Sequence, residues 1–511
     1  MTDDETRLAR LSIAPLLCLA AVQVLVHLLG NGSYGYFRDE LYYLACADHL
    51  GWGYVDHPPL SIFLLAVTRG LFGDSIFAIR LPAVLAGSGS VFLTGLLARE
   101  LGGGRFAQTT AALGCLVMAT PLALSSFFSM NAFDYLAWVV TALLLARILR
   151  TGRTRLWLAF GGVVGLALLN KISIAFLGFG LVVGLLLTPQ RRLLLDPRAW
   201  IGATIAFALF VPHLLWQVVN GFPTLEFMRN AQQYKILAMS PLQYLGAQVM
   251  LTSPFVAPVW LLGLACLLAA PSLRRYRTLG LAYLAILGVF LAQQAKAYYL
   301  APAYPMLVAA GTVALEEFTQ RRRRWLRPSV AVWLAIGGLV VVPLATPLLP
   351  PATYVSYTQR LGISPPREER SQVGELPQIF ADRFGWENMV ATIAGVYRSL
   401  PSSDQARASI FTGNYGEAGA VDFFGRRFGL PKAISGHNSY WLWGPGQATG
   451  EVVIVVGVAA DELRELFASV EPVATVVSPY AVPAENNLPV YLCRQLKLPL
   501  AEAWPRVKRF I

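Results

Sequence analysis

The sequence predicts a polytopic α-helical membrane protein with an α/β domain at its C-terminal end. Of its 511 residues, 56% are hydrophobic and only 14% are charged, whereas soluble domains carry about 25% charged residues. Apolar stretches near the length of a bilayer-spanning helix, roughly 20 residues, recur as far as residue 349. Beyond that point the apolar stretches give way to short strand and helix patterns.

Eleven apolar segments are candidate membrane spans. They are residues 11–30, 76–100, 105–122, 130–149, 155–170, 172–188, 199–218, 245–270, 279–294, 298–318 and 329–349. An odd number of spans places the N-terminus and the C-terminal segment on opposite sides of the membrane. Residues 1–349 are therefore expected to form the membrane domain.

Arginines gather between alternate spans, which indicates the orientation of the chain. The clusters lie at Arg147 to Arg155, Arg191 to Arg198, Arg274 to Arg277 and Arg321 to Arg324. With the N-terminus in the cytoplasm, every cluster falls on the cytoplasmic side, as the positive-inside rule requires. This pattern accounts for the net charge of +12 and argues against a nucleic-acid partner. We expect a multi-pass protein of the cytoplasmic (inner) membrane with its C-terminal domain outside, in the periplasm.

The first external loop, residues 31–75, gathers ionisable and aromatic residues in the segment "RDELYYLACADHLGWGYVDHPPL". Residues 39–50 and 59–73 are short for membrane spans and predict two helices at the outer membrane surface. Asp48, His49 and Asp56 are expected to make ordinary loop contacts. Asp39 stands out because other charges converge at the same membrane level.

Three further charged residues map to the outer ends of spans or to external turns. Asp134 lies at the outer end of the fourth span, Lys171 in the turn after the fifth and Lys296 in the turn before the tenth. Charges near the membrane are costly, so each is a candidate functional residue. Asn131 shares the helix face of Asp134 and could orient its carboxylate.

Carboxylates, cations and aromatic rings at an outer membrane surface suit two kinds of function. In a sugar transfer from a lipid-linked phosphate, a carboxylate takes the acceptor's proton and cations stabilise the departing phosphate. The aromatic residues Tyr42, Tyr43, Tyr298 and Tyr299 could then contact the sugar and the prenyl chain. The alternative is a transporter or flippase of lipid-linked precursors, for which the same residues would also serve.

Several motifs resemble one family. The loop segment quoted above, together with "FDYLAW", "LLNKISIAFLGF" and "AKAYYLAPAYP", resembles the GT-C glycosyltransferases related to protein O-mannosyltransferases and the lipid A aminoarabinose transferase. The resemblance covers residues 1–320. It implies a GT-C fold and an inverting transfer of sugar from a polyprenyl phosphate to a hydroxyl of a lipid, glycan or protein.

The resemblance also implies roles for individual residues. Asp39 would be the catalytic base or lie near it, and Asp134 would be the second acidic residue of the site. Arg38, Lys171 and Lys296 would hold the donor phosphate. The aminoarabinose transferase branch has a lysine just before "PP" where this chain has His57, so His57 could bind phosphate, bind a metal or pack.

The sequence leaves two further points open, the role of Glu40 and the binding of a metal ion. Glu40 follows Asp39 about 100° around the helix, so we expect it to orient groups or contact the acceptor. No cofactor is certain, although Asp39, Asp134 and His57 could bind a divalent metal ion.

The C-terminal segment divides into a proline-rich linker, residues 350–375, and an α/β domain, residues 376–511. Within the domain "WENMVATIAGVYRSL" and "DELRELFASV" predict helices, and "ASIFTGN" and "EVVIVVGV" predict strands. Residues 411–445 hold a dense polar and aromatic set, including Asn414, Tyr415 and His437. This set suits a glycan, or else reflects turn chemistry around glycines.

Overall fold

The computed structural model describes residues 8–320, 323–367, 369–370 and 372–511. Its contacts divide the chain into two units. We call Met1–Asn31, Arg80–Leu214 and Ala238–Leu348 the helical unit, and Gly32–Ile79, Leu215–Leu237 and Leu349–Ile511 the α/β unit. Of the predicted arginine clusters, Arg321 and Arg322 lie outside the described residues.

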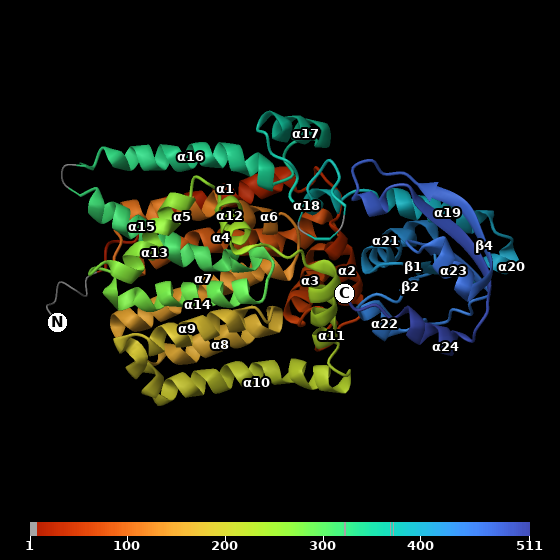
Figure 1. Ribbon diagram of the computed structural model, residues 1–511, viewed down its shortest axis with the longest axis horizontal. Coiled ribbons are helices and arrows are strands. Elements are labelled where there is room, and N and C mark those ends of the chain that lie inside the picture. Colours follow the sequence, from red (N-terminus) through yellow and green to blue (C-terminus); the bar gives the residue numbers. More distant parts are fainter. Residues whose placement is uncertain (1–7, 321–322, 368, 371) are drawn as a thin grey trace. The chain divides into compact units, whose positions relative to one another are not determined.

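The helical unit is a bundle of apolar helices (Figure 1). Its helices are α1 (Ile13–Gly30), α4 (Ile76–Glu100), α5 (Arg105–Leu116), α6 (Ala119–Leu124), α7 (Met130–Thr151), α8 (Leu156–Asn170), α9 (Ile174–Leu186), α10 (Pro197–Val219), α12 (Pro241–Thr252), α13 (Ala257–Ala269), α14 (Arg277–Ala292), α15 (Tyr304–Phe318) and α16 (Leu326–Ala345). Each of the eleven predicted spans overlaps at least one of these helices.

Seven helices within the described part of the chain are long and apolar enough to cross a membrane, or up to nine if two bent pairs each form one span. The predicted span 245–270 is one of these pairs, because α12 and α13 meet at a bend of 114°. Ser253 adopts a positive φ of 78° and precedes a proline, so the helix cannot continue through it. Since α8 and α5 are shorter than a full span, the count of eleven stays a prediction.

Glycines let helices of the bundle approach closely. A Cβ atom on Gly263 of α13 would lie 1.9 Å from the carbonyl oxygen of Leu307 in α15, and one on Gly311 of α15 would lie 2.0 Å from that of Val259. Only glycine fits at such distances, and small residues of this kind are typical of packed membrane helices. The α13–α15 pair is therefore fixed by backbone contact.

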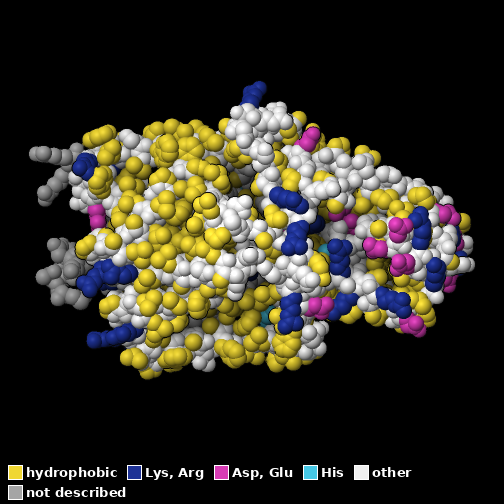
Figure 2. Space-filling model, in the orientation of Figure 1, with side chains coloured by type: hydrophobic (Ala, Val, Ile, Leu, Met, Phe, Trp, Pro, Cys, Tyr) yellow, Lys and Arg dark blue, Asp and Glu magenta, His cyan; other side chains and the backbone are white. Residues whose placement is uncertain are grey.

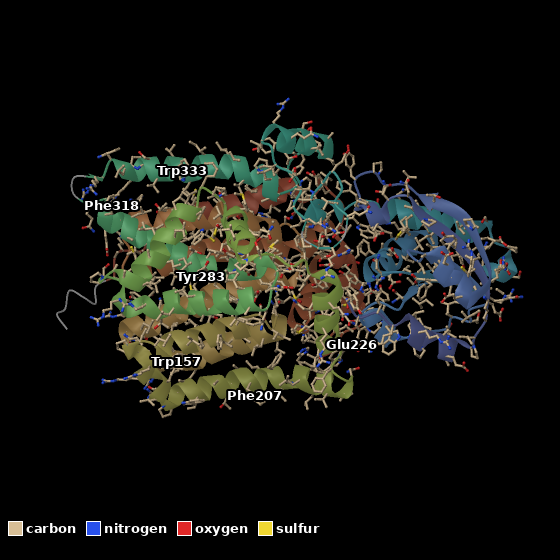
Figure 3. All side chains as sticks on the ribbon, viewed as in Figure 1. Trp157, Phe207, Glu226, Tyr283, Phe318 and Trp333 are labelled. Carbon is tan, nitrogen blue, oxygen red and sulfur yellow. The ribbon has the colours of Figure 1, made fainter. Side chains whose placement is uncertain are left out.

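Apolar side chains cover most of the face of this unit that Figure 2 shows. Phe207 of α10 and Trp333 of α16 (Figure 3) are among the exposed large hydrophobic residues, and so is Leu339 of α16. A water-facing surface would not carry so many of them. A lipid environment accounts for this surface.

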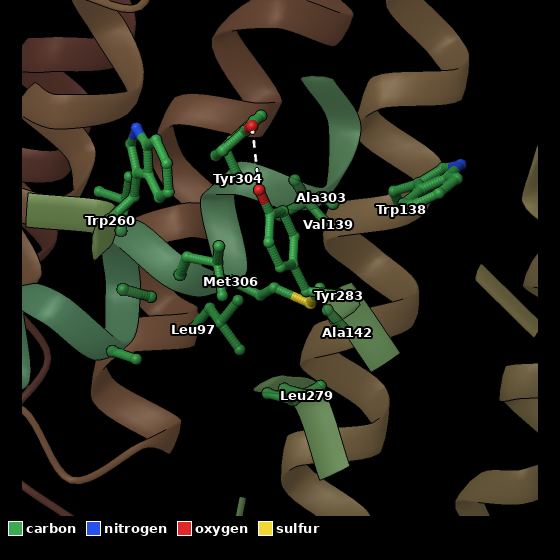
Figure 4. Packing of buried hydrophobic residues seen from close by; sticks show 14 of the residues in the cluster. Leu97, Trp138, Val139, Ala142, Trp260, Leu279, Tyr283, Ala303, Tyr304 and Met306 are labelled. Atoms are coloured by element: carbon green, nitrogen blue, oxygen red, sulfur yellow. Dashed lines mark hydrogen bonds between the residues drawn. The ribbon is translucent and has the colours of Figure 1, made fainter. Parts of the chain in front are cut away.

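A chain of hydrogen bonds runs through the core of the helical unit. The hydroxyls of Tyr283 and Tyr304 lie 3.1 Å apart (Figure 4), and Tyr304 donates to Gln248 Oε1 at 3.0 Å. Gln248 Nε2 in turn donates to the carbonyl of Ala297 at 3.1 Å. These hydrogen bonds hold the 3-10 turn Ala297–Ala303, which carries Tyr298 and Tyr299.

The α/β unit combines the first loop with the C-terminal segment. Its helices are α2 (Arg38–Asp48), α3 (Leu60–Phe72), α11 (Pro223–Asn230), α17 (Pro351–Arg360), α18 (Gln378–Ala381), α19 (Trp386–Ser399), α20 (Ser402–Gln405), α21 (Tyr415–Phe424), α22 (Ser439–Trp443), α23 (Ala460–Leu466) and α24 (Leu500–Ala503). Its strands are β1 (Ala408–Thr412), β2 (Ala433–Ser435), β3 (Val452–Val456), β4 (Phe467–Val476) and β5 (Leu488–Leu496). Helices α2 and α3 are the two short helices expected in residues 31–75.

Five strands among the described residues form one sheet in the order β2-β1-β3-β5-β4. Strands β1, β2 and β3 are parallel, with Ile410 opposite Ala433 and Ile454, and β5 and β4 continue the sheet antiparallel. The chain goes from β1 to β2 on one side and then to β3 on the other, so β1 is a topological switch point. Side chains at the carboxyl end of such a strand are well placed to build a site.

Two local predictions differ from the structure. The predicted linker contains helix α17, which begins with Pro351 at its first position, where proline is favourable. The helix predicted from "DELRELFASV" ends at Leu466, and Phe467 begins β4 instead. The long antiparallel pairing of β4 with β5 outweighs the local helical preference of these residues.

Replacing Glu100 with glutamine should destabilise the helical unit. The Glu100 side chain is 1% exposed and accepts hydrogen bonds from Arg147 (2.7 Å) and Arg150 (2.8 Å). Glu100→Gln leaves both guanidinium groups without their countercharge, and we expect the free energy of unfolding to fall by about 3 kcal/mol. Thermal unfolding in detergent micelles measures the change.

The matched control is Asp461→Asn, which removes one carboxylate from an exposed pair with Arg464. Exposed pairs contribute little because water and salt screen them, so the midpoint of this variant should stay near that of the wild type. Equal midpoints for both variants would contradict the assigned role of Glu100.

Candidate functional site

Helix α2 begins with a capping interaction that uses Glu40. The Glu40 carboxylate is fully buried and accepts a hydrogen bond from the backbone N–H of Phe37 at 2.8 Å. A carboxylate at this position accepts a hydrogen bond from a backbone N–H that has no partner within the helix. Its negative charge is also stabilised by the positive N-terminal end of the helix dipole. Glu40 was predicted as a catalytic residue that orients groups or contacts the acceptor; this contact supports only the orienting role.

Asp39 is the partly exposed carboxylate at the start of α2. Its side chain is 31% exposed and its Oδ1 accepts a hydrogen bond from the Tyr415 hydroxyl at 2.9 Å. The Arg38 guanidinium lies 3.9 Å from the same oxygen and 3.7 Å from the buried carboxylate of Asp382. Asp39 is therefore held by a tyrosine and an arginine while remaining open to solvent.

The rings of Tyr42 and Tyr43 surround His57. Tyr42 donates to Asp56 Oδ1 at 2.9 Å, and the Tyr43 ring lies edge-on to the His57 ring at 4.8 Å. Burial raises the pKa of Asp56 above its ordinary value. Asp56 was expected to make ordinary loop contacts, and Tyr42 was expected to contact the sugar or the prenyl chain. In the structure both residues belong to a buried polar cluster.

His57 is fully buried. Its Nδ1 donates to the carbonyl oxygen of Pro58 at 3.0 Å, and its Nε2 has no hydrogen-bond partner among the described residues. The nearest carboxylate oxygen of Asp56 lies 4.0 Å away. Of the three predicted roles, packing is the one that this enclosed position supports.

Asn414 caps helix α21. Its Oδ1 accepts hydrogen bonds from the N–H groups of Gly416 and Glu417 at 2.9 and 3.0 Å, and its Nδ2 donates to Glu417 and Glu485 at 2.8 and 2.9 Å. The capping contacts are those expected of asparagine before a helix. These contacts give Asn414 a structural role, and its predicted role in binding substrate stays a prediction.

His437 is buried and bonded through both ring nitrogens. Nδ1 accepts the backbone N–H of Tyr415 at 3.2 Å, and Nε2 faces the carbonyl oxygen of Ile511 at 2.8 Å, so Nε2 carries the hydrogen. Burial lowers the pKa of His437 to about 3. His437 is therefore a neutral imidazole that fixes the start of α21, and its predicted substrate contact stays a prediction.

A second group of predicted residues comes together in the helical unit. Asp134 is buried near the start of α7, where its Oδ1 accepts hydrogen bonds from Ser173 (2.7 Å) and Trp138 (3.1 Å). The Lys171 ammonium lies 3.6 Å from Asp134 Oδ2 and donates to Asn131 Oδ1 at 2.8 Å. The predicted convergence of Asp134, Asn131 and Lys171 is present in the structure.

Aromatic rings complete the surroundings of Lys171. Its Nζ lies 5.0 Å from the ring centre of Tyr299 and 5.9 Å from that of Tyr298. Both tyrosines belong to the 3-10 turn that follows Lys296. The Lys171 ammonium is therefore held in a fixed position by a carboxylate, an amide and two aromatic rings.

Metal binding was left open by the sequence. Within the described ranges, no three His, Cys, Asp or Glu side chains are arranged to hold a metal ion. Of the three residues named for this role, Asp39 and His57 belong to the α/β unit and Asp134 to the helical unit.

The sequence did not predict the partners that surround Arg38 and Asp39 in the structure. Tyr415 was noted only as part of a polar and aromatic set, and neither Asp382 nor Glu485 was singled out. All three lie more than 300 residues from Arg38 and Asp39. A lone tyrosine after a strand carries no sequence signal of such a distant partner.

Comparison with known proteins places these features in a family context. Residues 56–216 match the family model described as dolichyl-phosphate-mannose-protein mannosyltransferase. A solved structure of ArnT from Cupriavidus metallidurans, bound to undecaprenyl phosphate, superposes with a TM-score of 0.61 over 94% of this chain and 98% of that chain, at 16% identity. The fold is GT-C. The predicted fold class, a polytopic helical membrane protein with a C-terminal α/β part, is confirmed.

Two curated relatives extend the comparison. The lipid A galacturonosyltransferase RgtD of Rhizobium johnstonii is 27% identical over 46% of this chain and 50% of its own length. An undecaprenyl phosphate-α-4-amino-4-deoxy-L-arabinose arabinosyl transferase of Pseudomonas fluorescens is 28% identical over 25% of this chain and 23% of its own length. This chain therefore matches half or less of the length of these relatives. The predicted resemblance to this group of glycosyltransferases is confirmed.

His437 should make stability fall as the pH falls below about 6.5. The folded imidazole stays neutral down to a pKa of about 3, whereas an unfolded histidine takes up a proton near pH 6.5. Between these values the unfolded state binds more protons, so the free energy of unfolding drops by up to about 1.4 kcal/mol per pH unit. Thermal midpoints in micelles between pH 4 and 7 measure this slope.

Glutamine is neutral throughout and carries both a donor and an acceptor, so His437→Gln should show a shallower slope in this window. An unchanged slope in His437→Gln would contradict a neutral folded imidazole.

Proposed function

We propose that this chain transfers a sugar from a polyprenyl phosphate to an acceptor hydroxyl, with inversion, at the outer face of the cytoplasmic membrane. The observation that carries the proposal is the partly exposed Asp39 carboxylate, fixed by Tyr415 and Arg38. The N-terminus would lie in the cytoplasm and the α/β unit in the periplasm. The acceptor would be a lipid, a glycan or a protein.

Asp39 would act as the general base. Its carboxylate takes the proton of the acceptor hydroxyl as that oxygen attacks the anomeric carbon. The bond from the anomeric carbon to the phosphate oxygen breaks in the same step, and the polyprenyl phosphate leaves with the electron pair. One displacement from the opposite face inverts the anomeric centre.

Lys171 would stabilise the departing phosphate. It is held by Asp134 and Asn131, so its charge is in place before the reaction, which is the basis of electrostatic catalysis. Asp134 is buried and bonded to Ser173, Trp138 and Lys171, and we assign it to positioning Lys171. Lys296 would add positive charge from the neighbouring turn, and Tyr298 and Tyr299 would contact the sugar or the prenyl chain.

The comparisons support the donor class. The ArnT structure carries undecaprenyl phosphate, and one curated relative is named for an undecaprenyl-phosphate-linked aminoarabinose. The family description names a dolichyl-phosphate mannose. A polyprenyl phosphate is the feature common to these names, and two of them also name the sugar that it carries.

Asp39→Asn should abolish most of the transfer activity. Asparagine keeps the shape of the side chain but cannot accept the proton, so the rate should fall about 100- to 10,000-fold. The measurement follows release of free polyprenyl phosphate when purified protein is added to envelope membranes from a deletion strain, which supply donor and acceptor. Detection of the glycosylated product separates transfer from transport.

Asp48→Asn is the matched control on the same helix. The Asp48 carboxylate pairs with Arg69 and Arg426 at 3.0 and 2.7 Å, and we assign it no part in the chemistry. The transfer activity of Asp48→Asn should stay close to that of the wild type. Wild-type rates in Asp39→Asn would overturn the base assignment.

A further inference from the structure

We propose that Tyr415, from the C-terminal α/β domain, is a positioning residue for Asp39, so that this domain completes the transfer site. This inference rests on the proposed function, because it assigns Tyr415 a role only through the base. It gives the C-terminal domain a part in positioning the catalytic base.

The Tyr415 hydroxyl makes a short, well-defined contact. It donates to Asp39 Oδ1 at 2.9 Å, across 376 residues of sequence. One carboxylate oxygen is thereby occupied, and Oδ2 is left to accept the proton of the acceptor. Burial raises the pKa of Tyr415 well above its ordinary value, so the hydroxyl stays protonated and remains a donor.

The tyrosine ring is held on several sides. It is 7% exposed, and its centre lies 4.7 Å from the Tyr42 ring and 4.7 Å from the His437 ring. The Arg38 guanidinium lies 5.5 Å from its centre. A ring packed in this way loses little further freedom when its hydroxyl binds the carboxylate.

The backbone of Tyr415 is tied to the sheet. Tyr415 is the first residue of α21, two residues after Gly413, whose N–H donates to the Val456 carbonyl at the end of β3. Asn414 caps the helix, and His437 Nδ1 accepts the Tyr415 N–H. The hydroxyl is thus fixed relative to the switch point of the sheet.

Glycines allow α2 to reach this tyrosine. A Cβ atom on Gly416 would lie 2.2 Å from Arg38 Cγ, and one on Gly419 would lie 2.6 Å from the carbonyl carbon of Leu41. Any side chain at these positions would push α2 away. The close approach of the two helices brings Asp39 within hydrogen-bond distance of Tyr415.

The test is a four-variant cycle of wild type, Tyr415→Phe, Asp39→Asn and the double variant. Phenylalanine keeps the ring and removes only the hydroxyl. Initial rates are measured against the concentration of deletion-strain envelope membranes, with release of free polyprenyl phosphate as the readout. We expect Tyr415→Phe to lower kcat about 10- to 100-fold, as for loss of a hydrogen bond to a charged group, with an unchanged apparent KM.

The double variant separates positioning from a general structural role. If Tyr415 acts through Asp39, adding Tyr415→Phe to Asp39→Asn should cause no further loss, because the base is already absent. An equal loss in both backgrounds would overturn the proposal. So would a raised apparent KM with unchanged kcat, since that result would indicate substrate contact.

Tyr440→Phe is the matched control in the same domain. The Tyr440 hydroxyl is buried and donates to Asp422 Oδ2 at 2.9 Å, so this variant loses an equivalent bond away from Asp39. It should keep wild-type kcat. If Asp39→Asn retains full activity, the proposed function fails; if Asp39→Asn loses activity and Tyr415→Phe does not, only the role of Tyr415 fails.

Discussion

The packing of α2 against α21 is the contact on which the α/β unit depends. Gly419 of α21 lies against the backbone of Leu41, and Gly416 lies against the side-chain carbons of Arg38, so the two helices approach closely. The N–H of Arg38 also donates to the carbonyl of Asp382, at 2.9 Å. A loop helix that would be marginal alone is in this way built into the C-terminal domain.

The carboxyl groups near this packing differ in how far they are buried. Burial raises the pKa of Asp382 and Glu417 above their ordinary values, and the nearby Glu485 raises that of Glu417 further. Buried carboxyls of this kind hold protons or partners and cannot reach a substrate. Asp39 differs because it is partly exposed while its position is fixed. We infer that Asp39 is the carboxylate that takes part in the chemistry, whereas Asp382, Glu417 and Glu485 stabilise the structure.

The sequence predicted the parts of the site that local patterns control. Asn131 and Asp134 are three residues apart on one helix, and the predicted topology put Lys171 near the same membrane level. In the structure Lys171 contacts both residues. Helices α2 and α3 were also expected, because residues 39–50 and 59–73 are too short for membrane spans. The predicted fold class rested on the same kind of evidence, namely span length and charge distribution.

Local sequence patterns did not predict the long-range contacts or the backbone breaks. Asn414 and His437 are polar residues among glycines, which a sequence alone cannot distinguish from ligand contacts; the structure uses them to cap α21 and to hold its first N–H. Pro254 marks a possible break after Ser253, but the positive φ of Ser253 and the bend of 114° between α12 and α13 are known only from the structure. The Tyr415–Asp39 bond joins distant segments, and only the fold reveals it.

Hydrogen exchange of the α2 amides in Gly419→Ala tests most directly whether the loop helix and the C-terminal domain form one structural unit. The added methyl group would lie 2.6 Å from the Leu41 backbone, so we predict a loss of protection in α2 and α21 together. Gly395→Ala, on α19 with open space around the added atom, is the control and should leave both protected. Unchanged protection of α2 in Gly419→Ala would contradict the account.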